Sequence, residues 1–342
     1  MNIMKKWIFT GLGLITMGVC FVGCQGQQST AKSAGFKGPV LLAVDFKPDV
    51  PLKYKFVCER QTALNLDPSG HSRKGTGSGK VQNTTERLEM EIVYKPVEVN
   101  PYGYSIIEAT CNFANVTRSS SSGRSQSRPD AVKSVAGKSF TLKITPTGKV
   151  ADYSSLETLI KELGQNAFDG DVKRGRIKNP DMIMDFVATQ WSIWDSVSSI
   201  KNPLKGLKKN RTWDSKLLAP MPFISKVGRD VKYKLAGVIE SNDVYFAEIT
   251  SSYSLSESPP AGIIMPYTGS FQMKGTFGFL QGYKILSLEG TGRQLYDIEK
   301  GLIKSDTQQY KAKVSASIFG LGRDTLEPNI EIDQTITMTL VE

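Results

Sequence analysis

Two long parts of the chain alternate apolar and polar residues with a period of two, which is typical of half-buried β-strands. The alternation is clear at residues 52–56 and 88–94 in the first part, and at 231–235 and 310–318 in the second. The opposite faces of these segments carry Lys, Thr, Ser, Asp and Glu. One dry and one wet face is typical of antiparallel pairing, so the pattern predicts two antiparallel β regions.

The segment between these regions, residues 153–200, has helical periodicity instead. Ser154 and Glu157 have the spacing of a capping box, which predicts the start of a first helix. Asn179 and Pro180 predict the start of a second one. The second helix carries an apolar stripe of Ile183, Phe186, Val187, Trp191, Trp194 and Val197.

The apolar stripe of the second helix is expected to pack on the sheet as part of the core. Two alternatives remain open. In one, Phe186, Trp191 and Trp194 line a pocket that contacts a hydrophobic ligand; in the other, the helix lies on a membrane surface.

Similar short sequence motifs flank the helical segment and indicate that the two β regions are related. Residues 137–145 and 269–276 each place a Gly and a Ser before a Phe-containing strand. The predicted fold class is α+β and mainly antiparallel β, with two similar β halves that form a curved sheet or a sandwich or open barrel, and two helices inserted between them. The predicted divisions are a signal peptide at 1–23, a flexible tether at 24–37, a first β half at 38–152, the helical insert at 153–200 and a second β half at 201–342, with 38–342 as one structural unit.

The N-terminus has the pattern of an export signal. Lys5 and Lys6 precede an apolar run that is too short to span a bilayer as a mature helix. The run ends in Val22-Gly23-Cys24, which resembles the lipobox of bacterial lipoproteins and implies that Cys24 is lipidated, by palmitate among other chains, and becomes the new N-terminus. An ordinary secretory signal or an uncleaved anchor is the alternative.

Two cysteines remain after the signal peptide and the lipidated residue, Cys58 and Cys111. Each shares its strand parity with apolar neighbours, so both are expected on one face of the sheet. An even pair in an oxidising compartment predicts a Cys58–Cys111 disulfide, and two buried free thiols are the alternative.

The distribution of charge bears on which binding partners the protein can have. The formal net charge is +10, and residues 173–178 and 201–211 are locally basic, which indicates contact with anionic lipid headgroups or another polyanion; a solvated surface is the alternative. Asp181, Asp185 and Asp195 are expected on the polar side of the second helix, and they argue against an anionic membrane as the partner of that helix. The export signal disfavours nucleic acid.

Candidate catalytic chemistry is weak. The glycine-rich stretch 75–80 is not a phosphate-binding loop, because Lys74 and Val81 occupy positions that need Gly and Ser or Thr. His71, the single histidine, leaves no basis for a histidine triad or a metal cluster. We therefore expect no enzyme activity, no cofactor and no metal.

The order of the motifs resembles that of a family of exported, β-rich bacterial lipoproteins with no assigned activity. The shared pieces are the Gly-containing Phe strand at 137–145, the helical segment, a turn into Thr212-Trp213, and a strand around Tyr233. In architecture alone, the chain is similar to envelope lipoprotein carriers, whose open, curved sheet has helices over its apolar face. This likeness implies a fold and does not transfer a function.

These features together predict a lipid-anchored, non-enzymatic binding or interaction protein of the bacterial envelope. Its body is expected outside the cytoplasm, with the periplasmic face of the outer membrane favoured. The expected partners are the membrane, through acyl chains on Cys24, and a lipid or an envelope protein. The sharper alternative is a carrier that holds a hydrophobic ligand between sheet and helices.

Overall fold

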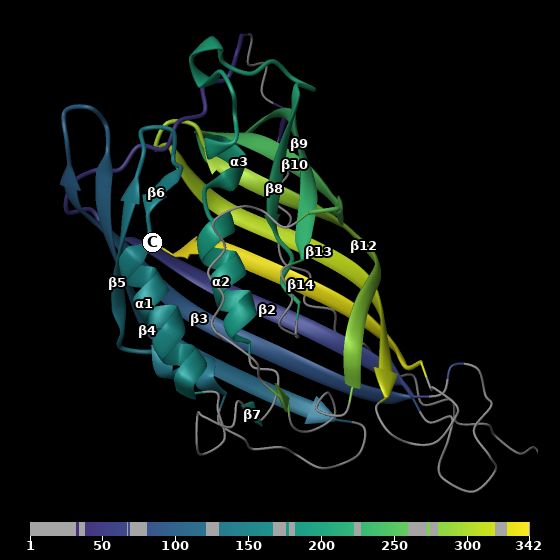
Figure 1. Cartoon of the computed structure of the whole chain (residues 1–342). Helices are drawn as coiled ribbons and strands as arrows, with labels where there is room; N and C mark the ends of the chain where they lie inside the picture. Colours follow the sequence, from purple (N-terminus) through teal and green to yellow (C-terminus); the bar gives the residue numbers. More distant parts are fainter. Residues whose placement is uncertain are drawn as a thin grey trace, which may run out of the picture.

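The computed structural model describes residues 32–33, 38–66, 68, 81–120, 130–166, 176–177, 182–221, 227–258, 272–273, 280–318 and 327–341. Within them, a curved twelve-stranded sheet forms most of the molecule (Figure 1). The predicted signal peptide, Cys24 and His71 lie outside the described residues. None of the helices in the described part of the chain is long and apolar enough to cross a membrane.

The first half is an antiparallel meander whose strands lie in the sheet in chain order. Its strands are β2 (Leu52–Asn65), β3 (Gln82–Val99), β4 (Ser105–Ser120), β5 (Ser139–Ile144) and β6 (Val150–Asp152). The predicted alternation is confirmed in β2 and β3, where the even-numbered residues are buried from Leu52 to Leu64 and again from Leu88 to Pro96.

The second half repeats this arrangement. Its strands in sheet order are β9 (Gly228–Ser241), β10 (Val244–Leu255), β12 (Leu280–Asp297), β13 (Leu302–Ile318) and β14 (Asn329–Val341), with β8 (Thr212–Leu218) paired to β9. The short β1 (Lys32–Ser33), which lies inside the predicted tether, also pairs with β9. A separate parallel pair joins β7 (Arg176–Ile177) to β11 (Gln272–Met273).

The two halves are joined into one sheet where the last strand of the chain, β14, pairs along its length with the first long strand, β2. The pairing runs from Asn329 opposite Asn65 to Val341 opposite Lys53. The sheet stays open, since β6 ends one side of the strand order and β1 the other. Of the three predicted arrangements, the structure therefore has the curved sheet.

The helical insert crosses one face of this sheet (Figure 1). It contains α1 (Ser154–Asn166), α2 (Ile183–Ser192) and α3 (Asp195–Ser198); the short turn η3 (Pro203–Lys205) follows it, and η1 (Ala131–Val135) precedes β5. The predicted first helix begins at Ser154, whose N–H donates to the Asp152 carboxylate at 2.9 Å. The predicted second helix is interrupted after Ser192 and divides into α2 and α3.

One core lies between the sheet and the insert. Phe186 meets Phe140 edge to face, with ring centroids 6.2 Å apart, and Trp194 meets Tyr94 at 5.6 Å. Phe46 closes over the other side of Trp194 at 5.3 Å. Because each such side chain contributes about 1.5–3 kcal/mol on burial, these contacts hold the helices on the sheet.

The segment at residues 38–50 runs along one end of the sheet (Figure 1, purple). Val40 forms a two-way backbone bridge with Leu207, the Asp45 N–H donates to Gly301, and the Asp49 N–H donates to Pro96. We call this end the tether end; it comprises residues 38–50 and the turns at 100–104, 199–211 and 298–301. It gathers the segment that follows the predicted tether and the loop that precedes β8.

The predicted disulfide is wrong, because Cys58 and Cys111 are both free and buried. They do share a face, as predicted, but β3 lies between their strands. Cys58 is opposite Leu88 and Cys111 is opposite Ile92. Two strand spacings and an offset of four residues place the Cα atoms about 16 Å apart, far beyond the ~7 Å limit of a disulfide.

Both thiols should be unreactive toward Ellman's reagent in the native protein and reactive after denaturation. Burial raises the pKa of the Cys111 thiol to about 11 and raises that of Cys58 as well, so little thiolate forms at neutral pH. A chain that begins at Gln25 retains only these cysteines. Its mass should be the same before and after reduction, and a gain of two hydrogens on reduction would contradict the structure.

Candidate functional site

The three predicted ligand contacts have different surroundings. Phe186 and Trp194 are buried in the core, as the favoured alternative for the stripe predicted. Trp191 is partly exposed and packs edge-on against Tyr153, with centroids 4.9 Å apart. The interface beneath Phe186 is thus filled by aromatic contacts, and the carrier hypothesis loses that location.

A cleft of about 300 Å³ lies where the β5–β6 turn, α2–α3 and β8 meet. Trp191 and Trp194 line it together, although Phe186 does not. We call it the Trp cleft; its other apolar lining comes from Val150 and Leu217, and its charged lining from Lys149, Asp195 and Lys216.

The β5–β6 turn that forms one side of the Trp cleft depends on a glycine. The Gly148 N–H donates to the Thr145 carbonyl at 2.9 Å, and the Lys149 N–H donates to the Thr145 hydroxyl at 3.0 Å. Gly148 has φ +85°, and a Cβ there would lie 2.6 Å from the Val44 side chain. A glycine is therefore required for this turn to approach residue 44 and Trp194.

Asp195 fixes the opposite side of the Trp cleft. Its carboxylate accepts hydrogen bonds from the Ser215 hydroxyl at 2.9 Å and the Tyr233 hydroxyl at 2.8 Å, which tie α3 to β8 and β9. Burial raises the pKa of Asp195, and the two donated hydrogen bonds oppose that rise. Asp195, expected on the polar side of the helix, is partly exposed at the cleft, and its carboxylate is engaged by these two hydroxyls.

A second cleft of about 580 Å³ shares Ser199 with the Trp cleft. Its lining includes Lys201, Lys205, Lys208 and Arg211 from the segment predicted to be basic, with Trp213 and Asp214. We call it the basic groove. The Trp cleft and the basic groove are therefore neighbours near the tether end of the molecule.

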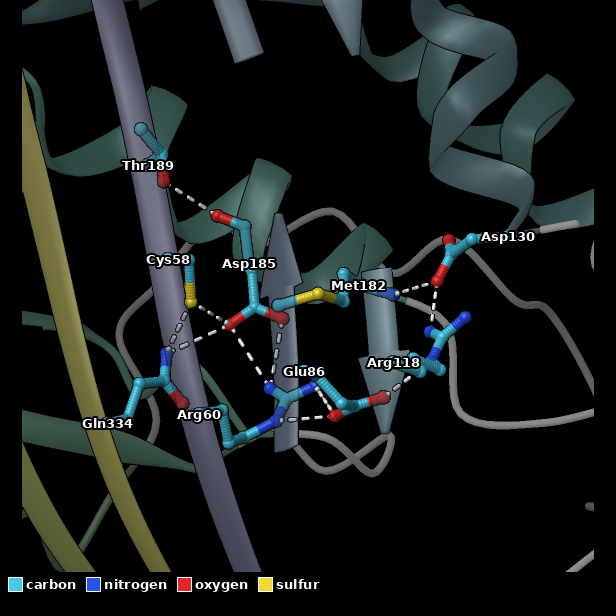
Figure 2. A network of polar contacts seen from close by, with 9 residues as sticks. All are labelled: Cys58, Arg60, Glu86, Arg118, Asp130, Met182, Asp185, Thr189 and Gln334. Carbon is cyan, nitrogen blue, oxygen red and sulfur yellow. Dashed lines mark hydrogen bonds and ion pairs between the residues drawn. The ribbon is translucent and has the colours of Figure 1, made fainter. Parts of the chain in front are cut away.

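A chain of alternating charges lies deeper, between α2 and the sheet (Figure 2). Arg60 on β2 donates to Asp185 on α2 at 3.0 Å and to Glu86 on β3 at 2.7 Å. Arg118 on β4 donates to Glu86 at 2.7 Å and also contacts Asp130. The chain connects β2, β3, β4 and the cap of η1 with α2.

The Arg60 chain holds α2 in place rather than forming a reactive centre. Burial raises the pKa of Asp185, and the nearby Arg60 guanidinium counters that rise. The Cys58 thiol is within 3.6 Å of Asp185, and burial together with that carboxylate raises its pKa. A thiol that stays protonated is a poor nucleophile. The expectation that Asp185 faces solvent is wrong, since Arg60 and Gln334 bind it inside the core.

A second buried arginine has different surroundings. Arg229 on β9 lies between the rings of Tyr253 and Tyr310, at 4.9 and 4.8 Å, and donates to the Gln308 side chain at 3.1 Å. Its Nε has no hydrogen-bond partner, and no carboxylate within the described residues forms an ion pair with it. Burial lowers the pKa of Arg229. The guanidinium thus lies between two aromatic faces, and the more distant carboxylates of Asp195 and Asp306 oppose the fall of its pKa.

Sequence reasoning missed both arginines, although each stands at a position that the alternation assigns to the buried face of its strand. Arg60 shares its parity with Tyr54, Phe56 and Cys58 on the dry face, and Arg229 shares its parity with Val231. A charged residue at such a position must find a partner inside the protein. Across the described ranges, no cluster of His, Cys, Asp and Glu is suited to bind a metal ion.

Comparison with known proteins finds no relative that shows the family of this chain. No family model and no curated protein matches the chain. Among solved structures, the chain is similar to lipovitellin, in a structure that concerns lipid–protein interactions, with 10% identity, a TM-score of 0.41 and 87% of this chain covered. The chain spans about a quarter, 26%, of lipovitellin.

A second solved structure, the enduracididine biosynthesis enzyme MppR complexed with the condensation product of pyruvate and imidazole 4-carboxaldehyde, is more distant. It has 9% identity and a TM-score of 0.11, with 90% of this chain and 98% of MppR covered. Both likenesses are too distant to support a function, and the resemblance to a family of exported bacterial proteins stays a prediction.

Arg60→Met should lower the free energy of unfolding by about 3–5 kcal/mol, because it leaves the buried Asp185 without its counter-charge. The matched variant Arg229→Met breaks no ion pair and loses two aromatic contacts, so it should cost less than Arg60→Met, about 2 kcal/mol. Chemical denaturation measures both. The double variant Arg60→Met/Asp185→Leu should recover part of the loss, and equal losses in the two single variants would contradict this account.

Asp306→Asn should raise stability at pH 7.5 and have little effect near pH 4. Burial raises the pKa of Asp306 to about 6 in the folded protein, above its unfolded value of about 3.9. The wild-type carboxyl therefore supports folding fully below about pH 4 and loses that contribution as the pH rises through 6. Thermal unfolding across this range measures the difference, and a pH-independent difference would be the contrary result.

Proposed function

We propose that this protein is a lipid-anchored protein of the bacterial cell envelope that binds a hydrophobic or amphiphilic ligand without transforming it. The observation that carries the ligand-binding part is the Trp cleft, at the edge of the insert, where the turn at Gly148 meets α2–α3 and β8. Its volume of about 300 Å³ falls at the lower limit of small-molecule sites, which favours a small ligand or one end of a longer one.

The lining of the Trp cleft favours an amphiphile with a negative group. Trp191, Val150 and Leu217 provide apolar surface, while Lys149 provides positive charge. Lys216 also lines the cleft, but its ammonium group already donates to Ser258 at 2.8 Å and pairs with Asp230 at 3.7 Å. The carboxylate present, Asp195, is already engaged by the Ser215 and Tyr233 hydroxyls. A ligand with an apolar chain and a carboxylate or phosphate would satisfy both parts of this lining.

The proposed ligand site is the Trp cleft and not the interface between α2 and the sheet. Phe186 and Trp194 fill the space between α2 and the sheet by packing on Phe140 and Tyr94. A ligand would therefore lie at the edge of the insert, against Trp191, rather than beneath the helix. Such a site leaves the core intact when it is empty, which suits reversible binding.

The proposed anchor rests on the N-terminal sequence. Lys5, Lys6, the apolar run and Val22-Gly23-Cys24 support export and lipidation. The free thiols of Cys58 and Cys111 give no support for an oxidising compartment, so the proposed extracytoplasmic location depends on the signal alone. We propose no catalytic role.

The chain from Gln25 onward should bind dansyl-undecanoic acid, an anionic amphiphile whose emission rises in apolar surroundings. Trp191→Ala should weaken this binding about tenfold, which corresponds to ~1.4 kcal/mol. Lys149→Glu should weaken binding of the acid more than binding of the corresponding uncharged alcohol.

Tyr102→Ala serves as the matched control, because Tyr102 is an exposed aromatic residue outside the Trp cleft. It should leave the affinity unchanged. Binding that is absent, or equally strong in Trp191→Ala and the parent, would exclude the ligand-binding function and favour recognition of an envelope protein.

A further inference from the structure

We propose that the tether end is a membrane-docking face that rests on a bilayer containing anionic lipids. The inference rests on the proposed lipid anchor for its orientation, and it does not depend on a ligand in the Trp cleft. Its evidence is an exposed apolar tip, a basic groove beside that tip, and the place where the N-terminal segment joins the body.

The apolar tip is Leu204 in η3, whose side chain is 91% exposed. Lys201 and Lys205 flank it in sequence, and both line the basic groove. An exposed leucine costs free energy in water but gains it in the acyl boundary of a membrane, where neighbouring lysines can reach the headgroups. Leu204 has the surroundings of such an interfacial anchor.

A second exposed leucine lies beside this tip. Val40 and Leu207 exchange backbone hydrogen bonds of 2.7 Å, and a Cβ on Gly206 would lie 2.7 Å from the Pro39 Cβ. The next residue, Leu41, is 51% exposed. The bridge thus holds residues 39–41 against the η3 loop and presents Leu41 and Leu204 from the same end of the sheet.

Tyr102 extends this surface into the β3–β4 turn. It is 82% exposed, and its N–H is held by the Asn100 side chain at 3.0 Å, which fixes the turn. Tyrosine is enriched at membrane–water interfaces because its ring is apolar and its hydroxyl is polar. The tether end therefore carries interfacial residues from the N-terminal segment, the η3 loop and the β3–β4 turn.

The charge of the basic groove specifies the lipid. Lys201, Lys205, Lys208 and Arg211 line it with one carboxylate, Asp214. Each basic residue near an anionic surface contributes about 1 kcal/mol of attraction, so this excess changes vesicle affinity by about fivefold per residue. A neutral bilayer provides no such electrostatic attraction, and the groove therefore distinguishes anionic from neutral membranes.

The tether geometry brings this end to the membrane. Seven residues separate Cys24 from β1, so the eight residue steps between Cys24 and Lys32 span at most about 28 Å, and β1 pairs with β9 at Ile239 and Glu240. The longest strands have 18 residues, or about 60 Å. A bilayer that holds Cys24 is thus within reach of the tether end, while the opposite end lies a strand length away.

Vesicle flotation of the chain from Gln25 onward, which contains every described residue and no lipidated cysteine, tests the proposal. The probes are phosphatidylcholine vesicles with and without 30% phosphatidylglycerol. The protein should float with the anionic vesicles and remain behind with the neutral ones, and salt should weaken binding. Leu204→Glu should reduce binding at least tenfold, and Lys201→Ala/Lys205→Ala/Lys208→Ala should reduce it about a hundredfold.

Matched variants away from the tether end control for exposure and charge. Leu286 on β12 is 52% exposed, and Leu286→Glu should bind as the parent does. Lys284→Ala/Lys311→Ala/Lys313→Ala removes the same charge from exposed positions on β12 and β13. It should reduce vesicle binding much less than the triple variant of the basic groove does. Equal binding by the groove variants and their controls, or equal flotation with neutral vesicles, would overturn the docking face.

Hydrogen exchange of the same chain provides a readout that does not need variants. Anionic vesicles should protect amides at 199–211 and in the turn at 100–104, and should leave the opposite end of the sheet unchanged. Protection at the opposite end alone would also overturn the proposal. Flotation that fails while dansyl-undecanoic acid still binds would refute the docking face and leave the proposed ligand function standing.

Discussion

The pairing of β14 with β2 is the constraint on which the rest of the structure depends. It joins two meanders by the last strand of the chain and the first long one, along a register from Asn329–Asn65 to Val341–Lys53. The strands at which the meanders meet the insert, β6 and β8–β9, then lie on opposite sides of the sheet. The insert must therefore cross the sheet face, and its apolar stripe becomes buried there. Loop-closure entropy opposes such a long-range pairing, so the buried faces of both meanders must offset it.

The charged chain around Arg60 determines where α2 lies on the sheet. Hydrophobic contacts between α2 and the sheet are non-directional, whereas Arg60 bonds Asp185 and Glu86 at defined distances. This pairing fixes α2 over β2 and β3 and explains why Phe186 fills the core. Once α2 is fixed, the chain beyond Ser192 turns at residues 193–194, and Trp191 is left at the boundary with solvent. The Trp cleft is thus a product of how the helix ends against β8.

The alternation of apolar and polar residues was sufficient to predict antiparallel strands, the helical insert and the stripe that packs on the sheet. It could not predict which strands are neighbours. Cys58 and Cys111 share a face, as their parity indicates, but the disulfide fails because β3 separates them. The alternation could not show that the carboxylates of Asp185 and Asp195 are engaged, because their partners, Arg60 and Tyr233, come from distant strands. The Trp cleft was missed in part for the same reason, since Val150 and Leu217 join Trp191 only through the sheet topology.

The central claim is that a folded, fully packed core coexists with a ligand site at its edge, in a protein held at a membrane. Native mass spectrometry of the chain from Gln25 onward, exported by a bacterial host and purified without detergent, tests it most directly. The account predicts a fraction of molecules that carry a lipid-sized adduct, which Trp191→Ala removes while the bare protein stays folded. A bare mass in the parent protein, or an adduct that persists in Trp191→Ala, would contradict the claim.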